Sequence, residues 1–270
     1  MTALSMPPPP EVRGAVPVLE ARGLTLDYAS PAGRLRAVED VSFGVAERER
    51  LVLLGPSGCG KSSILKALAG FIRPASGAVS IRGAAVTGPG PDRIVVFQEF
   101  DQLLPWKSVT DNVAFPLRVA RGIPLKEARA RAEAALVKVG LSRALHAYPH
   151  TLSGGMKQRA AIARALAAEP DVLLMDEPFA ALDALTRRTL QEDLLALAEE
   201  QGFTLVFVTH AIDEAVLVGT RLHLLAAHPG RTIASFETAC LGLAERGTPA
   251  FEQVVRDVHN LLFADGGHHV

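Results

Sequence analysis

The chain of 270 residues lacks most of the features that mark extracellular, membrane-spanning or nucleic-acid-binding proteins. Its two cysteines, Cys59 and Cys240, are too few for a disulfide framework, which is typical of a reducing compartment. No apolar run reaches the roughly 18 residues of a transmembrane helix. The opening segment Met1–Pro10 also lacks the charged-then-apolar pattern of a signal peptide. The formal net charge of −1 gives no indication of a basic surface for nucleic acid or of a polybasic patch for a membrane.

The remaining composition is that of a globular protein with a substantial core. Hydrophobic residues make up 49% of the chain and charged residues 21%. The length fits one large domain, or one domain with a small subdomain. No internal repeat is present, which predicts a single functional unit and not a fused pair. The prolines Pro7–Pro10 predict that residues 1–17 form an extended, disordered leader.

Periodicity predicts an α/β core that a helical segment interrupts. Short apolar runs predict strands at 18–26, 41–45, 51–54, 79–81, 94–97, 172–175, 204–208 and 221–226. Helix formers and caps predict helices at 63–69, 125–139, 154–168, 184–201 and 252–263. A further helix is predicted to begin at 109. The helical insert therefore covers about 99–168 of a domain at 18–234. The tail at 235–270 is too short for a regulatory domain of ordinary size.

A glycine-rich loop follows the buried strand at 51–54. Gly55-Pro-Ser-Gly-Cys-Gly-Lys61-Ser62 matches the G-x-x-x-x-G-K-[ST] pattern, and a strand precedes it and a helix follows, as the pattern requires. Its backbone N–H groups are predicted to cradle nucleotide phosphates, with Lys61 reaching the β- and γ-phosphates and the Ser62 hydroxyl binding Mg²⁺. Cys59 is interpreted as a small filler of the loop. The predicted nucleotide-binding residues here are Gly55, Ser57, Gly58, Cys59, Gly60, Lys61, Ser62 and Ser63.

Two carboxylates end the apolar strand at 172–175. Asp176 is expected to hold Mg²⁺, and Glu177 is the better candidate for the base that polarises the attacking water. The strand carboxyl end is where ligands bind in such sheets. A solvated strand end is the alternative for an Asp-Glu pair that stands alone.

Three further side chains are candidates by position. Gln98 follows the strand at 94–97 and can reach Mg²⁺ and the water, and His210 follows the strand at 204–208 and can bridge the γ-phosphate and Glu177. Tyr28 closes the first strand and offers a ring for stacking on adenine. Each of these alone is uninformative, and their order along the chain gives them weight.

The stretch Leu152-Ser-Gly-Gly-Met-Lys-Gln-Arg159 lies between the two phosphate-related motifs and resembles the signature of ABC-type ATPases. In that order, Tyr28, the phosphate loop, Gln98, the signature, Asp176–Glu177, Ala181-Leu-Asp183 and His210 are similar to the motif series of ABC ATP-binding subunits. The resemblance covers about 18–229. It implies a P-loop NTPase core of RecA-like α/β fold with an antiparallel β subdomain and an inserted α-helical subdomain. It also implies a head-to-tail homodimer around two Mg-ATP, in which Ser153, Gly154, Gly155 and Asp183 act on ATP held by the partner.

A narrower resemblance is to the nitrate/sulfonate/taurine importer group. The stretches that carry it are Phe97–Trp106, Asp111–Phe115, Pro178–Arg187 and His228–Arg231. It implies the ATPase of a bacterial importer at the cytoplasmic face of the cell membrane, with permease subunits and, indirectly, an extracytoplasmic substrate-binding protein as partners. Ala211, Ala180 and Gly219-Thr-Arg221 depart from the family pattern and concern the details of the switch region.

Two alternatives remain within the superfamily, namely a non-transport ATPase acting on nucleic acid or ribosomes and an exporter subunit. The near-neutral charge and the single unit disfavour the first, with no nucleic-acid partner expected, and the importer-like stretches disfavour the second. Four apolar residues beside Gln98 have two interpretations, a permease-docking surface or core packing. They are Phe100, Leu103, Leu104 and Trp106.

Overall fold

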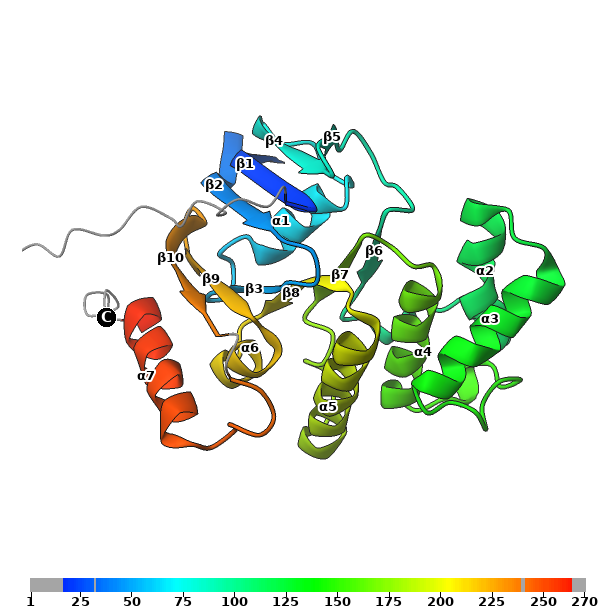
Figure 1. Cartoon of the computed structure of the whole chain (residues 1–270). Coiled ribbons are helices and arrows are strands. Elements are labelled where there is room, and N and C mark those ends of the chain that lie inside the picture. Colours follow the sequence, from blue (N-terminus) through cyan, green and yellow to red (C-terminus); the bar gives the residue numbers. More distant parts are fainter. Residues whose placement is uncertain (1–16, 32, 239–240, 264–270) are drawn as a thin grey trace, which may run out of the picture. The chain divides into compact units, whose positions relative to one another are not determined.

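The structure is a computed structural model that describes residues 17–31, 33–238 and 241–263 (Figure 1). The chain divides into two compact units, one running to Thr87 and resuming at Val208, the other spanning Gly88–Phe207. The boundary falls inside strand β8 (Thr204–Thr209). The predicted leader lies outside the described residues except for Pro17.

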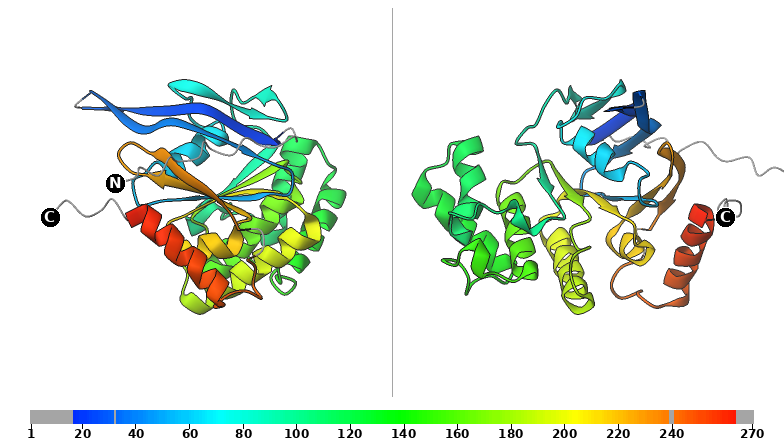
Figure 2. Two further views of the ribbon diagram at one scale, coloured as in Figure 1. Left: turned by 60° about the vertical axis from the view of Figure 1, so that its left-hand side comes forward. Right: turned by 180° about the vertical axis from the view of Figure 1, so that it is seen from behind.

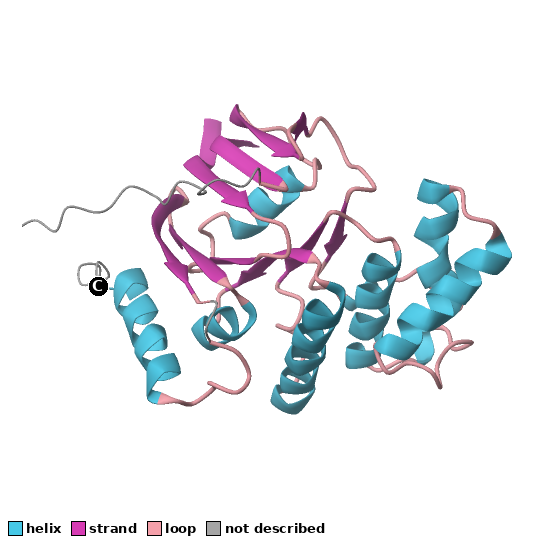
Figure 3. Ribbon diagram, viewed as in Figure 1, coloured by secondary structure: helices cyan, strands magenta, loops and turns pink. Residues whose placement is uncertain are grey.

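The first unit holds an antiparallel sheet with strand order β2-β1-β4-β5, drawn as magenta arrows in Figure 3. Its strands are β1 (Leu19–Ser30), β2 (Gly33–Val45), β4 (Ser76–Ile81) and β5 (Ala84–Ala85). The β1–β2 hairpin is longer than predicted, because backbone pairing continues to Ser30 and Gly33 beyond the apolar positions that the sequence marks. Tyr28 therefore lies within β1 and does not end it.

Three more strands of this unit form a second layer, in the order β10-β9-β3. They are β3 (Arg50–Leu54), β9 (Arg221–Ala226) and β10 (Arg231–Glu237). β3 runs parallel to β9, which pairs antiparallel with β10. Residues 51–54 of β3 are fully buried, as their apolar run predicts.

The helices of the first unit are α1 (Lys61–Leu68), α6 (Ile212–Val218) and α7 (Pro249–Phe263). α1 begins at Lys61, two residues before the predicted start, so that Lys61 and Ser62 belong to its first turn. α7 packs on α6, as both views in Figure 2 show. The predictions missed α6 and β10. α6 is only seven residues long, and β10 is half-exposed along most of its length and shows no alternation.

The second unit has strands in the order β8-β7-β6, with β6 (Arg93–Val96) parallel to β7 (Val172–Asp176). Its helices are α2 (Val109–Arg121), α3 (Leu125–Lys138), α4 (Gly154–Ala167) and α5 (Ala184–Gln201). Short 3-10 helices occur at Phe100–Gln102 and Pro149–Thr151. α2, α3 and α4 pack on one another (green in Figure 1), as expected for the helical insert.

Side-chain caps set where three of these helices begin. The Ser108 Oγ accepts a hydrogen bond from the backbone N–H of Asp111 (3.1 Å) and so caps α2. The Ser153 Oγ likewise caps α4, and the Asp183 carboxylate caps α5. Each cap fixes a loop that carries predicted site residues or leads to them.

Candidate nucleotide-binding site

The glycine-rich loop Gly55–Ser62 connects β3 to α1 in the first unit, as predicted. Gly60 has a φ of 88°, a left-handed conformation that a side chain would strain. A Cβ at Gly60 would also lie 2.5 Å from Val38 Cγ2 and 2.9 Å from the Ala37 carbonyl oxygen. The loop is therefore packed against β2 with no room for a side chain at this position.

Lys61 is buried within its own loop. Its Nζ donates to the carbonyl oxygens of Gly55 (2.8 Å) and Pro56 (3.0 Å) and lies 3.8 Å from Cys59 Sγ. Cys59 is fully buried, and this burial raises the pKa of its thiol although the Lys61 ammonium opposes the shift. The packing agrees with the interpretation of Cys59 as a filler. A buried ammonium held by two carbonyls can exchange them for phosphate oxygens.

Tyr28 and Ser63 meet in the first unit. The Tyr28 hydroxyl donates to Ser63 Oγ at 2.9 Å, and 37% of the tyrosine remains exposed. A cavity of about 320 Å³ opens beside this ring, lined also by Arg34 and Arg73. The exposed face of the ring leaves an aromatic surface available for stacking.

His210 is the remaining predicted site residue of the first unit. It is exposed and directly follows β8. Beside it, the Thr209 hydroxyl donates to Glu214 (2.5 Å) and accepts the backbone N–H of Ala211 (3.1 Å). The backbone after His210 is thus fixed by Thr209, although Ala211 replaces the residue usual in the family.

The acidic strand end lies in the second unit. Asp176 is the last residue of β7, and Glu177 follows with a φ of 44°. A non-glycine residue is uncommon in this left-handed region, and such strain is concentrated at functional sites. Arg187 holds the loop that follows, donating to the carbonyl oxygens of Phe179 (3.2 Å) and Leu182 (2.8 Å). Arg187 therefore holds the loop that follows Asp176–Glu177, a role that the sequence did not indicate.

The loop after β6 is tied to the signature helix by two glutamines that the sequence analysis did not single out as site residues. Gln102 Nε2 donates to the carbonyl oxygens of Phe97 and Glu99, both at 3.0 Å, and to Oε1 of the buried Gln158 at 3.5 Å. Gln98 itself is exposed on this loop. Gln158 lies in the signature, so the signature and the Gln98 loop are in direct contact.

A second buried amide, that of Asn112, fixes the next part of this loop. Its Oδ1 accepts the backbone N–H of Leu104 (2.7 Å), and its Nδ2 donates to the carbonyl oxygens of Leu104 (3.0 Å), Lys107 (3.1 Å) and Ser108 (3.1 Å). Asn112 is fully buried, so these bonds replace hydration completely. The only sign of this role in the sequence is that Asn112 belongs to Asp111–Phe115, one of the stretches that resemble the importer group.

The four apolar residues beside Gln98 do not behave alike. Trp106 is 72% exposed, whereas Leu103 is buried at 3% and Leu104 is half-buried. The side chain of Phe100 lies outside the described part. The prediction of a permease-docking role is wrong for Leu103, which packs in the core. For Trp106, which is exposed, a docking role stays a prediction.

The signature loop presents Ser153 at the N-terminus of α4. The Ser153 Oγ accepts the backbone N–H of Met156 (3.3 Å), so its own O–H hydrogen is directed elsewhere. A Cβ at Gly155 would lie 2.7 Å from Thr186 Cγ2, so this glycine permits close packing on α5. Asp183 caps α5, and hydrogen bonds from the backbone and side chain of Thr186 lower the pKa of its carboxyl.

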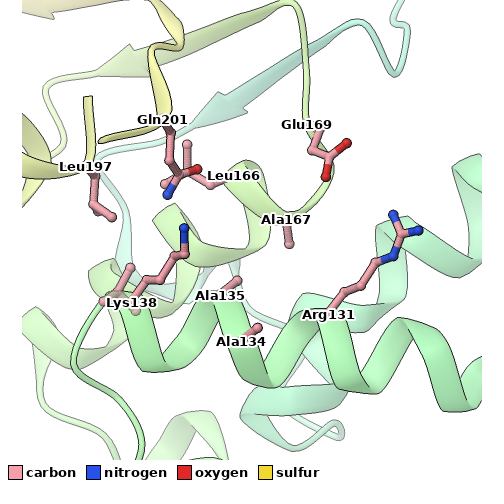
Figure 4. A pocket seen from close by; sticks show the side chains of 10 residues that line it. Arg131, Ala134, Ala135, Lys138, Leu166, Ala167, Glu169, Leu197 and Gln201 are labelled. Carbon is pink, nitrogen blue, oxygen red and sulfur yellow. The ribbon is translucent and has the colours of Figure 1, made fainter. Parts of the chain in front are cut away.

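A separate cavity of about 260 Å³ in the second unit lies among α3, α4 and α5 (Figure 4). None of the predicted site residues lines it. Its basic residues Arg131 and Lys138 already pair with Glu127 (2.7 Å) and Glu200 (2.6 Å).

The described residues contain no group of three or more His, Cys, Asp or Glu side chains placed to hold a metal. The predicted magnesium donors are instead the Ser62 hydroxyl, the Gln98 amide oxygen and the Asp176 carboxylate. Hard oxygen donors of this kind suit Mg²⁺, which usually keeps several waters and also binds substrate phosphates. Among the residues that the structure describes, no helix is both long and apolar enough to cross a membrane.

Comparison with known proteins agrees with this set of motifs. The sequence profile of the ABC transporter family matches residues 38–180. The chain belongs to the ABC transporter family. It is 49% identical over 211 residues to a taurine import ATP-binding protein of Rhizobium johnstonii, a match that covers 78% of this chain and 80% of the relative. It is 46% identical over 207 residues to a nitrate import ATP-binding protein of Synechococcus elongatus, covering 76% and 75%.

Solved structures of ABC cassettes have the same fold. The dimeric structure of MJ0796, a bacterial ABC transporter cassette, has a TM-score of 0.72 at 33% identity, covering 82% of this chain and 98% of that one. A dimeric post-hydrolysis state of the same cassette, bound to ADP and Pi, has a TM-score of 0.70 at 31% identity, with the same coverage. The predictions of an ABC-type ATPase and of a P-loop NTPase fold are therefore confirmed. So is the narrower resemblance to the nitrate/sulfonate/taurine group.

Proposed function

We propose that this chain is the ATP-hydrolysing subunit of a bacterial importer for a small anionic or zwitterionic solute such as taurine, another sulfonate or nitrate. It would act at the cytoplasmic face of the cell membrane, bound to permease subunits that receive solute from an extracytoplasmic binding protein. The observation that carries the proposal is the phosphate loop, the acidic strand end and a capped signature helix on one ABC-type fold. The taurine and nitrate import relatives support the solute class.

In this proposal the phosphate loop and Lys61 bind the ATP phosphates. Lys61 Nζ exchanges the carbonyl oxygens of Gly55 and Pro56 for β- and γ-phosphate oxygens, a gain because the new hydrogen bonds are charge-assisted on both sides. Tyr28 stacks on adenine. Ser62, Asp176 and Gln98 would hold Mg²⁺, which when bound neutralises phosphate charge.

Hydrolysis is assigned to Glu177 and His210. Glu177 accepts the proton of the attacking water, and its strained backbone fixes the carboxylate at the strand end. His210 donates a hydrogen bond toward the γ-phosphate and holds the loop near it. Both residues are positioned by neighbours, Glu177 by the loop that Arg187 holds and His210 by Thr209.

The second copy of the chain completes the site in a head-to-tail homodimer. Ser153 and the N-terminal backbone of α4, including Gly154 and Gly155, would donate to the γ-phosphate held by the partner. Asp183 would contact the partner near its phosphate loop. The dimeric cassette structures support a homodimer.

Coupling to the permease is assigned to the loop that carries Trp106. Asn112 fixes its backbone from inside while the indole remains exposed, an arrangement suited to an aromatic anchor. Trp106→Ala should reduce binding to the cognate permease in a reconstituted complex by about tenfold or more, the size expected of a hot-spot residue. The ATPase rate and melting temperature of the free chain should change little.

The matched control is Phe263→Ala, which removes another exposed aromatic ring, on α7. It should leave permease binding unchanged. A Trp106→Ala variant with lowered stability and ATPase but undiminished permease binding would contradict the docking role. In that case the apolar residues of this loop would serve the core, as Leu103 does.

A further inference from the structure

The turn between β9 and β10 has no role in the function proposed above, although His228-Pro-Gly-Arg231 is among the stretches typical of the importer group. In the first unit this turn lies against β2 and the phosphate loop. The Gly230 backbone N–H donates to the Ala37 carbonyl oxygen (2.9 Å), and the Gly230 carbonyl accepts the N–H of Glu39 (2.8 Å). Gly230 thus extends the pairing of β2 by one residue, opposite Val38.

The same glycine touches the backbone of the phosphate loop. A Cβ at Gly230 would lie 2.1 Å from the Cys59 carbonyl oxygen and 3.2 Å from that of Ala37. Gly230 does not have a positive φ, so the constraint here is space and not backbone conformation. The contact falls on one particular peptide group, the one joining Cys59 to Gly60.

That peptide group has two functional ends. Because a peptide is planar, the Cys59 carbonyl and the Gly60 N–H move together when the plane tilts. The Gly60 N–H is one of the donors proposed to cradle phosphate. The contact of Gly230 with the Cys59 carbonyl therefore also determines the direction in which the Gly60 N–H points.

Charged side chains hold the turn in place from the outside. Arg231 donates to Glu39 Oε2 through Nε (2.7 Å) and through Nη2, and Arg36 Nη1 donates to Glu39 Oε1 (2.8 Å). These hydrogen bonds, from Arg231 first and Arg36 second, lower the pKa of the Glu39 carboxyl. Arg36 in turn contacts Asp27 of β1 (3.1 Å). The His228 ring lies 3.5 Å from where a Cβ of Gly58 would be, so a second residue of the turn lies close to the phosphate loop.

We infer that the His228–Arg231 turn is a positioning element for the phosphate loop, with Gly230 as its contact point and Arg231 as its anchor on β2. It orients the Cys59–Gly60 peptide before nucleotide arrives, so that less ordering is required on binding. This inference rests on the proposed phosphate-binding role of Gly55–Ser62. It assigns no catalytic group to the turn.

Gly230→Ala tests the inference, in a Cys240→Ser background. The added methyl cannot coexist with the Cys59 carbonyl at 2.1 Å, so the loop must shift. We expect ATP affinity to fall by about tenfold or more, measured with a fluorescent ATP analogue. Labelling of Cys59 by a thiol reagent without nucleotide should become several-fold faster, because the thiol is fully buried in the parent. The control is Gly88→Ala, where a Cβ would meet nothing within 4 Å.

Arg231→Gln and Arg231→Lys give an independent measurement with a milder change. The glutamine variant should weaken ATP binding about two- to fivefold without shifting the melting temperature, and lysine should restore part of the loss. Parental ATP affinity and parental Cys59 labelling in Gly230→Ala would overturn the inference. If that variant does not fold, parental ATP affinity in Arg231→Gln would overturn it.

Lys61→Ala separates this inference from the proposed function. If Lys61→Ala loses ATP binding while the turn variants keep it, only the positioning role fails. If Lys61→Ala also retains full ATP affinity, the phosphate-loop assignment itself is wrong. Loss in both sets supports both statements.

Discussion

The phosphate loop and the Trp106 loop are both fixed by buried polar groups, but they differ in what covers their outer side. Around the phosphate loop, Lys61 and Cys59 are buried and Gly230 packs on the backbone from behind. In the Trp106 loop, Asn112 binds the backbone from inside and the indole is 72% exposed. The first loop is completed by its own chain, whereas the second leaves a large apolar side chain without cover from its own unit.

This difference matches the two tasks. A phosphate cradle must hold its donors in place before the ligand arrives, which favours packing on every side but one. A docking loop needs a rigid backbone and an exposed anchor. The comparison implies that a substitution in the phosphate loop alters nucleotide affinity directly. A substitution of the residue that supports the Trp106 loop should instead alter the mobility of that loop and its binding to a partner.

The largest expected effect is on the phosphate side. Lys61→Ala removes the ammonium that would meet the β- and γ-phosphates, and ATP affinity should fall about 100-fold, or about 2.7 kcal/mol. Titration with a fluorescent ATP analogue measures it. Lys66→Ala, an exposed lysine on the same helix, is the control and should bind ATP as the parent does. Equal affinity in Lys61→Ala and Lys66→Ala would end the distinction between the two loops.

The next effect, on stability instead of nucleotide affinity, is expected from removing the support of the Trp106 loop. Asn112→Ala removes the hydrogen bonds that this buried amide makes with the Leu104 N–H and with the carbonyl oxygens of Leu104, Lys107 and Ser108, and should lower the free energy of unfolding by about 2–3 kcal/mol. Trp106 is the only tryptophan in the chain, so fluorescence anisotropy reports on this loop alone.

Anisotropy should fall in Asn112→Ala and stay unchanged in Asn260→Ala, which alters an exposed asparagine of α7. Nucleotide affinity of the folded Asn112→Ala protein should change less than that of Lys61→Ala. An unaltered Trp106 signal would show that Asn112 does not hold the loop.

The smallest effect concerns protonation inside the first unit. His223 is buried against Phe43 and shares a hydrogen bond with Thr232 (3.0 Å), and burial, aided by the Arg221 charge, lowers its pKa from 6.5 to about 4. Between these values the unfolded chain binds a proton that the folded chain excludes, so stability falls as pH falls from 6.5 toward 4. At pH 5 this difference amounts to about 2 kcal/mol.

Melting temperatures at pH 7 and pH 5 test this statement. His223→Gln cannot take up that proton and should lose less stability over this range than the parent. His146→Gln removes an exposed histidine and should behave as the parent does. Identical pH dependence in parent and His223→Gln would contradict a neutral, buried imidazole.

Local signals allowed the sequence to predict the elements that carry the nucleotide motifs. The sequence predicts a helix at about 184–201 and a strand at 221–226, and the structure gives α5 and β9 these bounds, with Asp183 capping α5 and Gly202 ending it. The phosphate loop could be identified because only glycine-rich backbone turns N–H groups toward phosphate. The homologous relatives agree with the function that these motifs imply.

Contacts between distant residues could not be predicted in the same way. Gly230 meets Cys59 and Ala37 from the other end of the chain, and no local pattern reports such an approach. Leu103 and Trp106 have similar apolar character, yet one is buried and the other exposed, and no local pattern distinguishes them. The hydrogen bond between Gln102 and Gln158 joins residues far apart in the sequence. The hydrogen bond from Arg187 to the Leu182 carbonyl lies within a loop that has no regular pattern.

The central claim is that Glu177 acts as the base of an ATPase that works as a dimer. Glu177→Gln keeps the shape and removes the base, so ATP turnover should fall about 100-fold or more. ATP binding should persist, and sizing chromatography should show an ATP-dependent dimer. Glu199→Gln, an exposed glutamate on α5, should hydrolyse ATP at the parental rate. Parental turnover by Glu177→Gln, or a monomer with ATP bound, would contradict the account.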